Sequence, residues 1–540
     1  MRTLVSVVFL LFSASFASFS LCFAQADDRP NILLLVADDL GYADLGSYGG
    51  DIDTPNIDAL AERGLRFTQF HTAPTCAPTR AMLLSGNDNH VAGMGLQGER
   101  MDVPGYEGHL SDRIVPFPLL LQDAGYHTYA VGKWHLGKEE IDSPAAKGFE
   151  RSFNLLQGAG NHYNDIGLLA ADSVSLYRED GRLVDWPEGR YSTELYTSKL
   201  IQFIEDGMDD GRPFFAFAAF TSPHWPLQAP EPFRSKYRGR YDMGYDDLRV
   251  QRLASLKRAG VIPEDAELPP RLDFLRPWSD LSDEERQVES RKMELYAAML
   301  DNLDFHVGRI LDSLQTKGLL ENTLIVFMSD NGAAANDFYV TEPFQSFLQP
   351  RYDNSYENMG LPTSFVSYGP QWAHAGAAPF NRYKGFGTEG GTAVPIIVTG
   401  PMVPFRGEIT GAYATVMDLA PTILEIAGAT YPGSHGSSST RPLLGQSMLA
   451  LISRRSDSVH APDYVVAFEQ NGRAFLRRGD WKLVAHDLRQ GEDAFMLFNV
   501  AKDLGETTDL SSISPTKYLE MKTLWSQYWK DSKLPILASP

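Results

Sequence analysis

One cysteine stands in a stretch of residues suited to binding an anion and reacting with it. Cys76 is followed by Pro78 and Arg80, and apart from Cys22 in the apolar N-terminal segment it is the only cysteine of the 540-residue chain. Arg80 opens an amphipathic run that predicts a helix, which places the sulfur just before a helix N-terminus. Free backbone N–H groups and the helix dipole favour anions there, and Arg80 adds a fixed positive charge. The stretch is therefore suited to holding a sulfate- or phosphate-like group.

Acidic residues follow two apolar runs that are typical of strands buried on both faces of a parallel sheet. The first run ends in Asp38 and Asp39, and the second ends in Ser-Asp-Asn-Gly, which contains Asp330 and Asn331. A lone acidic pair is more often a polar loop or a helix cap, but recurrence at a second strand end favours a site, because ligands of open α/β sheets bind beyond the carboxyl ends of strands. These all-oxygen ligands predict a hard divalent cation, Ca²⁺ first and Mg²⁺ second.

Basic and imidazole side chains follow two further predicted strands. One strand runs into Gly-Lys-Trp-His-Leu-Gly, which contains Lys133 and His135, and the apolar run 214–220 leads to His224. Lys384 lies in a later loop. Each of these residues alone would more often be a solvated or satisfied polar group. Together the pattern predicts that five strand ends bring acids, two lysines, two histidines and the Cys76 loop to one edge of a sheet.

A rigid frame must hold these groups. Ser282 opens a capping-box sequence that predicts a long helix, whose apolar stripe runs from Met293 through Tyr296 to Leu314. We assign that stripe to the core. The region 337–380 is long and aromatic-rich, and two interpretations remain open for it. It is either a wall or lid over the site that contributes to substrate choice, or an insert that serves packing.

The sequence Cys-x-Pro-x-Arg at 76–80 resembles the signature of the type I sulfatases, and the motifs at the strand ends resemble further sulfatase motifs. The similarity runs from about Arg29 to beyond Asp509 and is greatest to the bacterial arylsulfatases. It implies an alkaline-phosphatase-like α/β fold, with a large mixed, mostly parallel sheet sandwiched by helices. A smaller C-terminal α+β subdomain with an antiparallel sheet is expected to follow.

The resemblance also implies two groups that the protein would acquire. Cys76 would be oxidised to formylglycine, an aldehyde, by a separate formylglycine-generating enzyme. One Ca²⁺ per chain would be bound by Asp38, Asp39, Asp330, Asn331 and the modified Cys76. The hydrate of the aldehyde would attack the sulfur of a sulfate ester, with Asp330 as base.

The remaining matched residues would handle charge and protons. Arg80, Lys133 and Lys384 would stabilise the sulfate oxygens. His224 or Lys384 would protonate the leaving alcohol, and His135 would help the second hydroxyl of the hydrate to expel sulfate. One position departs from the family, since Ala393 stands where relatives usually carry Arg. We expect a lost surface or structural salt bridge there and intact chemistry.

Other interpretations stay open from the residues themselves. Cys76 could be a small buried hydrophobe or a thiol nucleophile with a distant His. The whole protein could be a phosphodiester or phosphonate ester hydrolase of the same superfamily, or a non-catalytic protein that binds sulfated glycans. The oxygen-only metal ligands and the Gly-Lys-Trp-His-Leu-Gly motif favour sulfate. Aryl sulfates, alkyl sulfates and sulfated sugars all remain candidate substrates, and the aromatic insert favours an apolar or aromatic leaving group.

The ends and the composition of the chain bear on location and partners. Residues 1–26 predict a signal peptide, with Arg2, an apolar run and an Ala-Gln-Ala cleavage sequence, so we expect an exported protein, periplasmic or secreted, and bacterial. The domains are predicted at 27–432 for catalysis and 433–540 for the C-terminal subdomain. The net charge of −21 argues against a nucleic-acid partner, and no stable membrane insertion is expected after signal cleavage.

Overall fold

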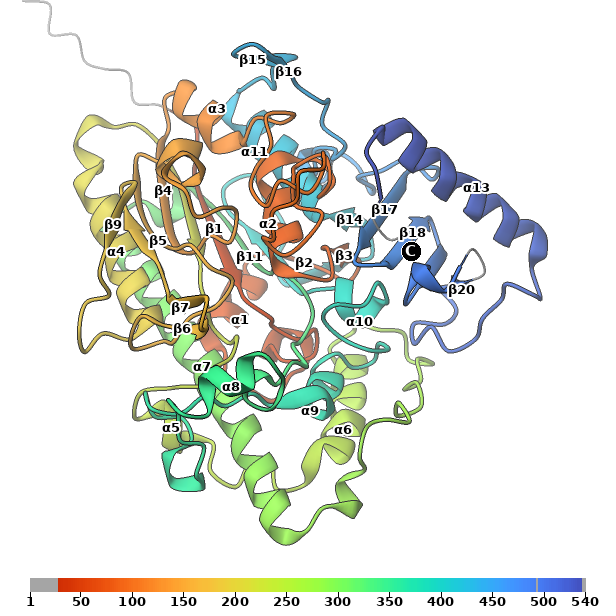
Figure 1. The fold of residues 1–540 in the computed structure, drawn as a ribbon. Coiled ribbons are helices and arrows are strands. Elements are labelled where there is room, and N and C mark those ends of the chain that lie inside the picture. The colour runs from red at the N-terminus through yellow and green to blue at the C-terminus, as the bar shows by residue number, and fades with distance from the viewer. Residues whose placement is uncertain (1–27, 492–493, 537–540) are drawn as a thin grey trace, which may run out of the picture.

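The computed structural model describes residues 28–491 and 494–536, so the predicted signal peptide lies outside the described residues. Figure 1 shows a large α/β body, with a smaller unit of sheet and helix at the C-terminal end of the chain. The body is built on a ten-stranded sheet with the order β13-β2-β12-β11-β1-β10-β4-β5-β8-β9. The predicted fold class is confirmed in both parts, a mostly parallel large sheet and a small antiparallel one.

Four adjacent parallel strands form the centre of the sheet: β11 (Thr323–Ser329), β1 (Asn31–Ala37), β10 (Phe214–Ala219) and β4 (His127–Lys133). Every residue of these strands is buried, which explains the apolar sequences of β1, β10 and β11. Their register aligns the carboxyl ends, because Ala37 lies opposite Ser329 and Ala219 lies opposite Gly132. The residues after all four strands therefore meet at one edge of the sheet.

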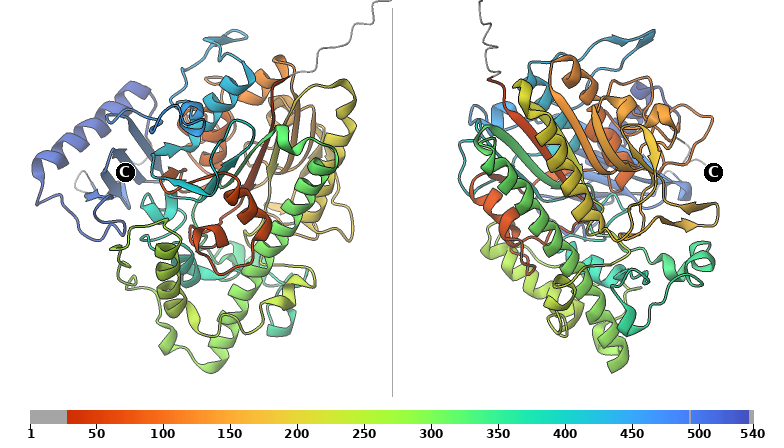
Figure 2. Two further views of the ribbon diagram at one scale, coloured as in Figure 1. Left: turned by 180° about the vertical axis from the view of Figure 1, so that it is seen from behind. Right: turned by 90° about the vertical axis from the view of Figure 1, so that its left-hand side faces the viewer.

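Helices cover both faces of the sheet. On one face lie α1 (Pro55–Glu62), α4 (Ser192–Asp206) and α7 (Asp283–Thr316), and Figure 2 shows α4 and α7 running side by side. The other face carries α2 (Cys76–Ser85), α3 (Phe117–Asp123) and α11 (Leu419–Ala427). Alternate residues of β1 enter different cores: Leu33 and Leu35 pack with the first set, and Ile32 and Leu34 with the second. The sheet is thus buried on both sides.

The long helix begins as predicted. The Ser282 hydroxyl accepts a hydrogen bond from the backbone N–H of Glu285, whose carboxylate accepts one from the backbone N–H of Ser282. This capping box satisfies donors that an uncapped helix would leave unpaired.

The remaining elements of the body are shorter. The outer strands of the main sheet are β2 (Leu65–Phe67), β5 (Arg151–Leu155), β8 (Tyr177–Glu179), β9 (Arg182–Val184), β12 (Ile396–Thr399) and β13 (Glu408–Thr410). Small sheets pair β3 (Phe70–His71) with β14 (Ala414–Thr415), β6 (Ile166–Leu169) with β7 (Asp172–Val174), and β15 (Ser434–His435) with β16 (Ser438–Ser439). Further helices are α5 (Phe233–Lys236), α6 (Gly244–Arg258), α8 (Phe344–Leu348), α9 (Gly369–Gly376) and α10 (Glu389–Thr392).

The C-terminal unit is a four-stranded antiparallel sheet covered by one helix. The sheet comprises β17 (Val465–Gln470), β18 (Arg473–Arg478), β19 (Trp481–Ala485) and β20 (Phe495–Asn499), and α13 (Pro515–Ser532) packs on it. The segment before it includes α12 (Leu449–Ile452), whose Leu451 and Ile452 pack into the second core of the body. The segment that follows the predicted boundary at residue 433 therefore still packs against the body.

Three local expectations were wrong. Helix α2 begins at Cys76 itself, where Pro78 is tolerated because the first turn needs no N–H from it, so Arg80 lies one turn inside the helix. Only four of the five strand ends that were expected to carry site residues belong to this edge, since Cys76 follows β3 of a separate sheet and Lys384 precedes the antiparallel β12. The parallel strand β5 also ends there but carries none of the predicted site residues. The region 337–380 is only partly irregular, because it contains α8, α9 and two short 3-10 turns.

Candidate functional site

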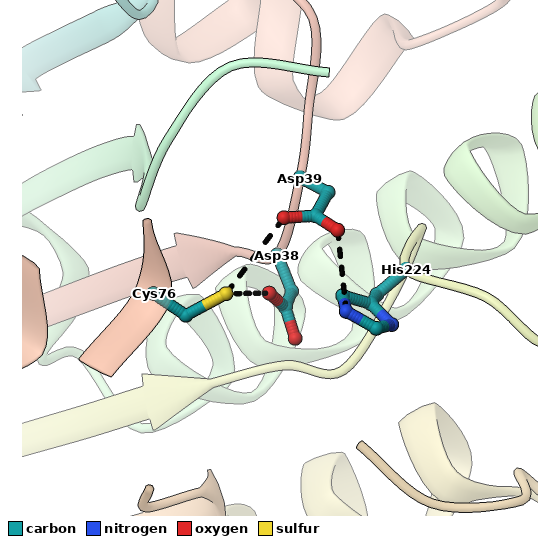
Figure 3. A group of neighbouring side chains, drawn as sticks. All are labelled: Asp38, Asp39, Cys76 and His224. Atoms are coloured by element: carbon teal, nitrogen blue, oxygen red, sulfur yellow. Dashed lines mark hydrogen bonds and ion pairs between the residues drawn. The ribbon is translucent and has the colours of Figure 1, made fainter. Parts of the chain in front are cut away.

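Four buried side chains meet at the carboxyl edge of the sheet (Figure 3). The Sγ atom of Cys76 lies 3.5 Å from Oδ1 of Asp38 and 3.8 Å from Oδ1 of Asp39. His224, from the loop after β10, places Nε2 3.2 Å from Oδ2 of Asp39. Asp39 adopts a left-handed backbone conformation with φ of 66°, which turns its carboxylate back toward the sheet edge. A non-glycine residue in this conformation stores strain of a kind that clusters at functional sites.

Three cations surround the two carboxylates. Lys133 Nζ lies 2.9 and 2.8 Å from the two oxygens of Asp38, and Lys384 Nζ lies 2.5 Å from Oδ1 of Asp39 and 3.0 Å from Cys76 Sγ. Arg80 donates from Nε and Nη2 to Oδ2 of Asp330, at 3.1 and 2.7 Å. Its Nη1 donates to the carbonyl oxygen of Lys133, at 2.8 Å, which ties helix α2 to the end of β4.

The glycine before Lys133 is required by the sheet. Gly132 has a φ of 92°, and a Cβ atom there would lie 1.9 Å from the carbonyl oxygen of Ala219 on the neighbouring strand. The chain can therefore turn Lys133 into the site only because residue 132 lacks a side chain.

The charges set the protonation of the site. Burial raises the pKa of Asp38 and Asp39, but the neighbouring positive charges, chiefly Lys133 at Asp38 and Lys384 at Asp39, together outweigh it and hold both pKa values below the ordinary range. Burial lowers the pKa of His224, which favours a neutral imidazole. Burial also raises the pKa of the Cys76 thiol to about 12, so an unmodified Cys76 is protonated at neutral pH and a poor nucleophile.

The same edge offers oxygen ligands for a cation. The Asn331 side chain donates from Nδ2 to Oδ1 of Asp39, at 2.6 Å, while its Oδ1 is buried and has no hydrogen-bond partner among the described residues. Oδ1 of Asp330 accepts the backbone N–H of Asp39, at 3.3 Å. Three carboxylates and an unpaired amide oxygen fit a hard cation such as Ca²⁺. The structure also brings His224 to this group, which sequence reasoning assigned only to the substrate side.

His135 is held in one tautomer. Its Nε2 lies 2.8 Å from the backbone carbonyl oxygen of Gln97, which can only accept, so Nε2 carries the proton. Nδ1 is buried without a partner among the described residues, and burial lowers the pKa of the ring well below its ordinary value. A neutral imidazole with a free lone pair is the form that a general base needs.

Sequence reasoning missed two residues of the site. Gln97 lines the cavity, and its Oε1 accepts the backbone N–H of Ala77 in the first turn of α2, at 3.3 Å, but no motif surrounds it. Tyr296 was assigned to the core stripe of α7, and its ring is indeed in the core. Its hydroxyl, however, donates to Oδ2 of Asp44, at 2.6 Å, and the same oxygen accepts the backbone N–H of Gly41, at 2.8 Å. Tyr296 therefore braces the turn that follows Asp39.

A cavity of about 750 Å³ opens above Cys76, and His135, His224 and Lys384 line it. Both interpretations of the aromatic insert are correct for different parts of it. Phe338 and Phe344 line the cavity, whereas Tyr368 and Trp372 are buried in the main core.

Ala393, which stands where an arginine was expected from the family resemblance, has a structural role, since it is buried next to α10. Glu389, four residues earlier, is fully buried, lies 2.7 Å from His71 Nε2 and forms ion pairs with Arg477 and Lys482 at 3.4 and 2.6 Å. Both cations come from the C-terminal sheet, so this carboxylate is neutralised without an arginine at position 393.

The sulfatase family model matches residues 30–429. An uncharacterised sulfatase of Schizosaccharomyces pombe is 39% identical over 525 residues, covering 93% of this chain and 94% of its own length. An arylsulfatase of Klebsiella aerogenes is 38% identical over 436 residues, covering 79% and 93%.

Solved structures agree on the fold. The crystal structure of Ps i-CgsB matches with a TM-score of 0.66 at 24% identity, covering 93% of this chain and 92% of its own. A structure of BT4656 in complex with its substrate, D-glucosamine-2-N,6-O-disulfate, matches with a TM-score of 0.61 at 21% identity, covering 94% and 98%. The family match and the identity to the arylsulfatase establish that this chain belongs to the sulfatase family and is a sulfuric ester hydrolase.

Proposed function

We propose that the chain hydrolyses sulfate esters to an alcohol and inorganic sulfate, with a formylglycine made from Cys76 and a bound Ca²⁺. The observation that carries this proposal is that Cys76, His135, His224 and Lys384 line one cavity, with Lys133 and Arg80 buried behind them. Relatives of the chain include an arylsulfatase and N-acetylgalactosamine-6-sulfatases, so aryl and sugar sulfates are both candidate substrates.

The two acquired groups would supply the nucleophile and positive charge. Hydrated formylglycine would supply one hydroxyl as the nucleophile for sulfur and a second hydroxyl for the release of sulfate, and Ca²⁺ would supply charge stabilisation. Asp38, Asp39, Asp330 and Asn331 would hold the cation. An exported enzyme, as residues 1–26 predict, would receive the formylglycine from a generating enzyme in the same host.

The chain's own residues would stabilise the negative charge and transfer the protons. Lys133, Lys384 and Arg80 place fixed positive charge around the sulfate oxygens in a buried setting, where such charges act strongly. His224 lines the cavity beside Cys76, and its protonated form would pass a proton from Nε2 to the leaving oxygen, since Nδ1 donates to the Trp225 carbonyl oxygen. His135 offers Nδ1 as a base near the residue 76 side chain, with the tautomer fixed by Gln97.

The proposal is tested on enzyme produced together with a formylglycine-generating enzyme. Mass analysis of the peptide bearing residue 76 should show the aldehyde, and an active enzyme with only the thiol would refute the modification. Values of kcat/KM are compared for p-nitrophenyl sulfate, p-nitrophenyl phosphate and bis-p-nitrophenyl phosphate. We expect sulfate to be preferred and activity to fall when Ca²⁺ is chelated. A preference for a phosphorus ester would move the protein to the phosphodiesterase or phosphonate ester hydrolase side of the superfamily.

A sulfated-glycan-binding protein without turnover is the remaining alternative. It predicts binding of sulfated sugars with no release of sulfate by the modified protein. Calorimetric titration with a sulfated monosaccharide, run beside the release assay, separates the two.

A further inference from the structure

The cavity above Cys76 has walls of different chemistry, and the leaving alcohol must lie along one of them. Trp225 follows His224 directly in the chain, and the two rings lie 4.1 Å apart. Since His224 is suited to pass a proton to the leaving oxygen, the alcohol part of the substrate lies on the Trp225 side. The residues of that wall therefore contact the part of the substrate that differs between sulfate esters.

The Trp225 wall is apolar. We call it the apolar shelf and define it by Leu168, Trp225, Phe338 and Phe344, all of which line the cavity. Phe338 packs edge-on against Trp225 with ring centroids 4.7 Å apart, and it stacks on Phe344 at 3.9 Å with the rings nearly parallel. The shelf is assembled from separate parts of the chain, because α8 of the aromatic insert packs against β6, as Figure 1 shows.

A small hydrophobic cluster supports the shelf from behind. Its buried members include Phe347, Leu348 and Phe365, and this cluster is separate from the two cores on the faces of the main sheet. Leu168, Phe338 and Phe344 are its partly buried members. Their apolar surface faces the cavity, so a ligand that covers it gains binding free energy from burial.

A second wall is acidic. Its cavity-lining carboxylates are Glu99, Glu107, Glu139 and Asp142, and the basic Arg100 and Lys138 line the cavity as well. Glu107 pairs with Arg113 at 2.6 Å, and Asp142 lies 3.5 Å from His109. A fifth carboxylate, Asp172, lies on β7 beside the strand β6 that carries Leu168, and it pairs with Lys138 at 2.7 Å. Glu99, Glu139 and Arg100 are exposed and form no ion pair within the described part of the chain. An additional anionic group on a substrate would therefore meet two unpaired carboxylates against one unpaired guanidinium, on a protein whose net charge is already −21.

We propose that the site takes monosulfate esters of bulky, uncharged, apolar alcohols and discriminates against substrates with further sulfate or carboxylate groups. The inference rests on the proposed sulfate-ester hydrolysis and adds the class of alcohol. The shelf binds the hydrocarbon face of the alcohol, and Phe338 and Phe344 determine specificity. The acidic wall repels a second anion. The volume of about 750 Å³ leaves room for an alcohol larger than a single ring.

The test compares substrates of equal intrinsic reactivity. Cyclohexylmethyl sulfate and glucose 6-sulfate both carry a primary sulfate on a six-membered ring and differ in the polarity of that ring. We expect kcat/KM to be at least about 10-fold higher for cyclohexylmethyl sulfate, because the shelf can bury its apolar surface. Glucosamine 2-N,6-O-disulfate should be hydrolysed at least about 10-fold less efficiently than glucose 6-sulfate at low ionic strength, and the difference should shrink in salt.

Variants assign the preference to the two walls. Phe338→Ala and Phe344→Ala should each lower the ratio of kcat/KM between cyclohexylmethyl sulfate and glucose 6-sulfate by about 5- to 10-fold. The change should lie mainly in KM, since contacts remote from the sulfur bind substrate and transition state alike. Phe305→Ala is the control, because Phe305 is an exposed phenylalanine of α7 that does not line the cavity. The double variant Glu99→Gln with Glu139→Gln changes only exposed side chains and should raise kcat/KM for the disulfate about 3- to 10-fold.

The outcomes separate this inference from the function on which it rests. If the formylglycine form releases no sulfate from p-nitrophenyl sulfate or any of the three test esters, the proposed function fails. If it hydrolyses p-nitrophenyl sulfate but prefers glucose 6-sulfate to cyclohexylmethyl sulfate, the function stands and the substrate class is overturned. An unchanged substrate ratio in both phenylalanine variants, with circular dichroism like that of the parent, would also overturn it.

Discussion

Two of the buried clusters of charge in the described part of the chain differ in purpose, and we assign chemistry to only one of them. The edge cluster, around Cys76, contains Asp38 and Asp39 with Lys133 and Lys384. The junction cluster contains Glu389 and Glu506 with His71, Arg477 and Lys482, where the body meets the C-terminal sheet. In burial, and in the pairing of two carboxylates with cations, the two clusters are alike.

They differ in backbone conformation and in the group that the cavity reaches. In the edge cluster, Asp39 has a strained φ, and Cys76 and Lys384 line a cavity of about 750 Å³. In the junction cluster, both oxygens of Glu389 are paired and its exposed fraction is 0%, although Arg477 lines a smaller cavity of about 390 Å³. Buried charge and unpaired atoms alone do not mark an active site, because a structural ion-pair network shifts pKa values just as strongly and His71 Nδ1 also has no hydrogen-bond partner among the described residues. The strained Asp39 and a cavity lined by Cys76 make the distinction.

The largest expected effect tests the edge cluster. Cys76→Ala removes the side chain that would become formylglycine, so kcat should fall by at least about 10³-fold, with little change in thermal stability. Steady-state kinetics on p-nitrophenyl sulfate and a thermal melt measure the two effects. Cys76→Ser tests whether a hydroxyl of similar size restores turnover. If Cys76→Ala kept its turnover, the reaction would have to occur elsewhere in the molecule.

The reciprocal change in the junction cluster should affect stability. Glu389→Gln leaves Lys482 and Arg477 buried without their carboxylate, which should lower the free energy of unfolding by about 3 kcal/mol. The kcat of the remaining folded protein should stay within about 2-fold of the parent. Chemical denaturation and active-site titration measure the two effects. A large fall in kcat without loss of stability would show that the junction cluster takes part in catalysis.

A smaller effect, on Ca²⁺ affinity, is expected from Tyr296 of helix α7, which contacts the turn beside the edge cluster. Tyr296→Phe removes the hydroxyl that braces the turn after Asp39, so Ca²⁺ should bind about 10-fold more weakly. Calorimetric titration with Ca²⁺ measures the affinity directly. Tyr368→Phe is the matched control, because Tyr368 stacks on Tyr296 with ring centroids 4.6 Å apart and makes no hydrogen bond to Asp44. Equal Ca²⁺ affinities in both variants would leave Tyr296 as a core residue only.

The smallest effect concerns pH and the junction cluster. Burial raises the pKa of Glu506 from 4.5 to about 7. The folded state then binds its proton more tightly than the unfolded state, so this group's contribution to stability is greatest below pH 4.5 and is lost as pH rises to 7. Glu506→Gln should flatten the fall in unfolding free energy between pH 5 and 7, by about 1 kcal/mol. Urea denaturation across this range measures the slope, and identical slopes in parent and variant would place the pKa of Glu506 near its ordinary value.

Much of the site could be predicted from the sequence, because its motifs are local. The three apolar runs and the strand that ends at Lys133 are fully buried, and the residues that follow them lie at one edge as expected. The start of α2 was misplaced because Pro78 suggests a break, whereas the first turn of a helix tolerates proline. Asp38, Asp39, Cys76 and His224 come together because parallel strands in register bring their carboxyl ends to one place.

The set of reactive residues and the strands that carry them could be predicted from the sequence alone, because apolar runs, turns and motifs depend on neighbours in the chain. The tertiary structure decided everything that depends on residues far apart. It placed the Gln97 carbonyl on His135, the Tyr296 hydroxyl beside the turn after Asp39, and the shelf of Phe338 and Phe344 next to Trp225. A side chain in a core stripe or an insert gives no local sign of what its polar atom or ring will contact. Packing fixes those contacts, because close-packed side chains from distant segments leave few alternative arrangements.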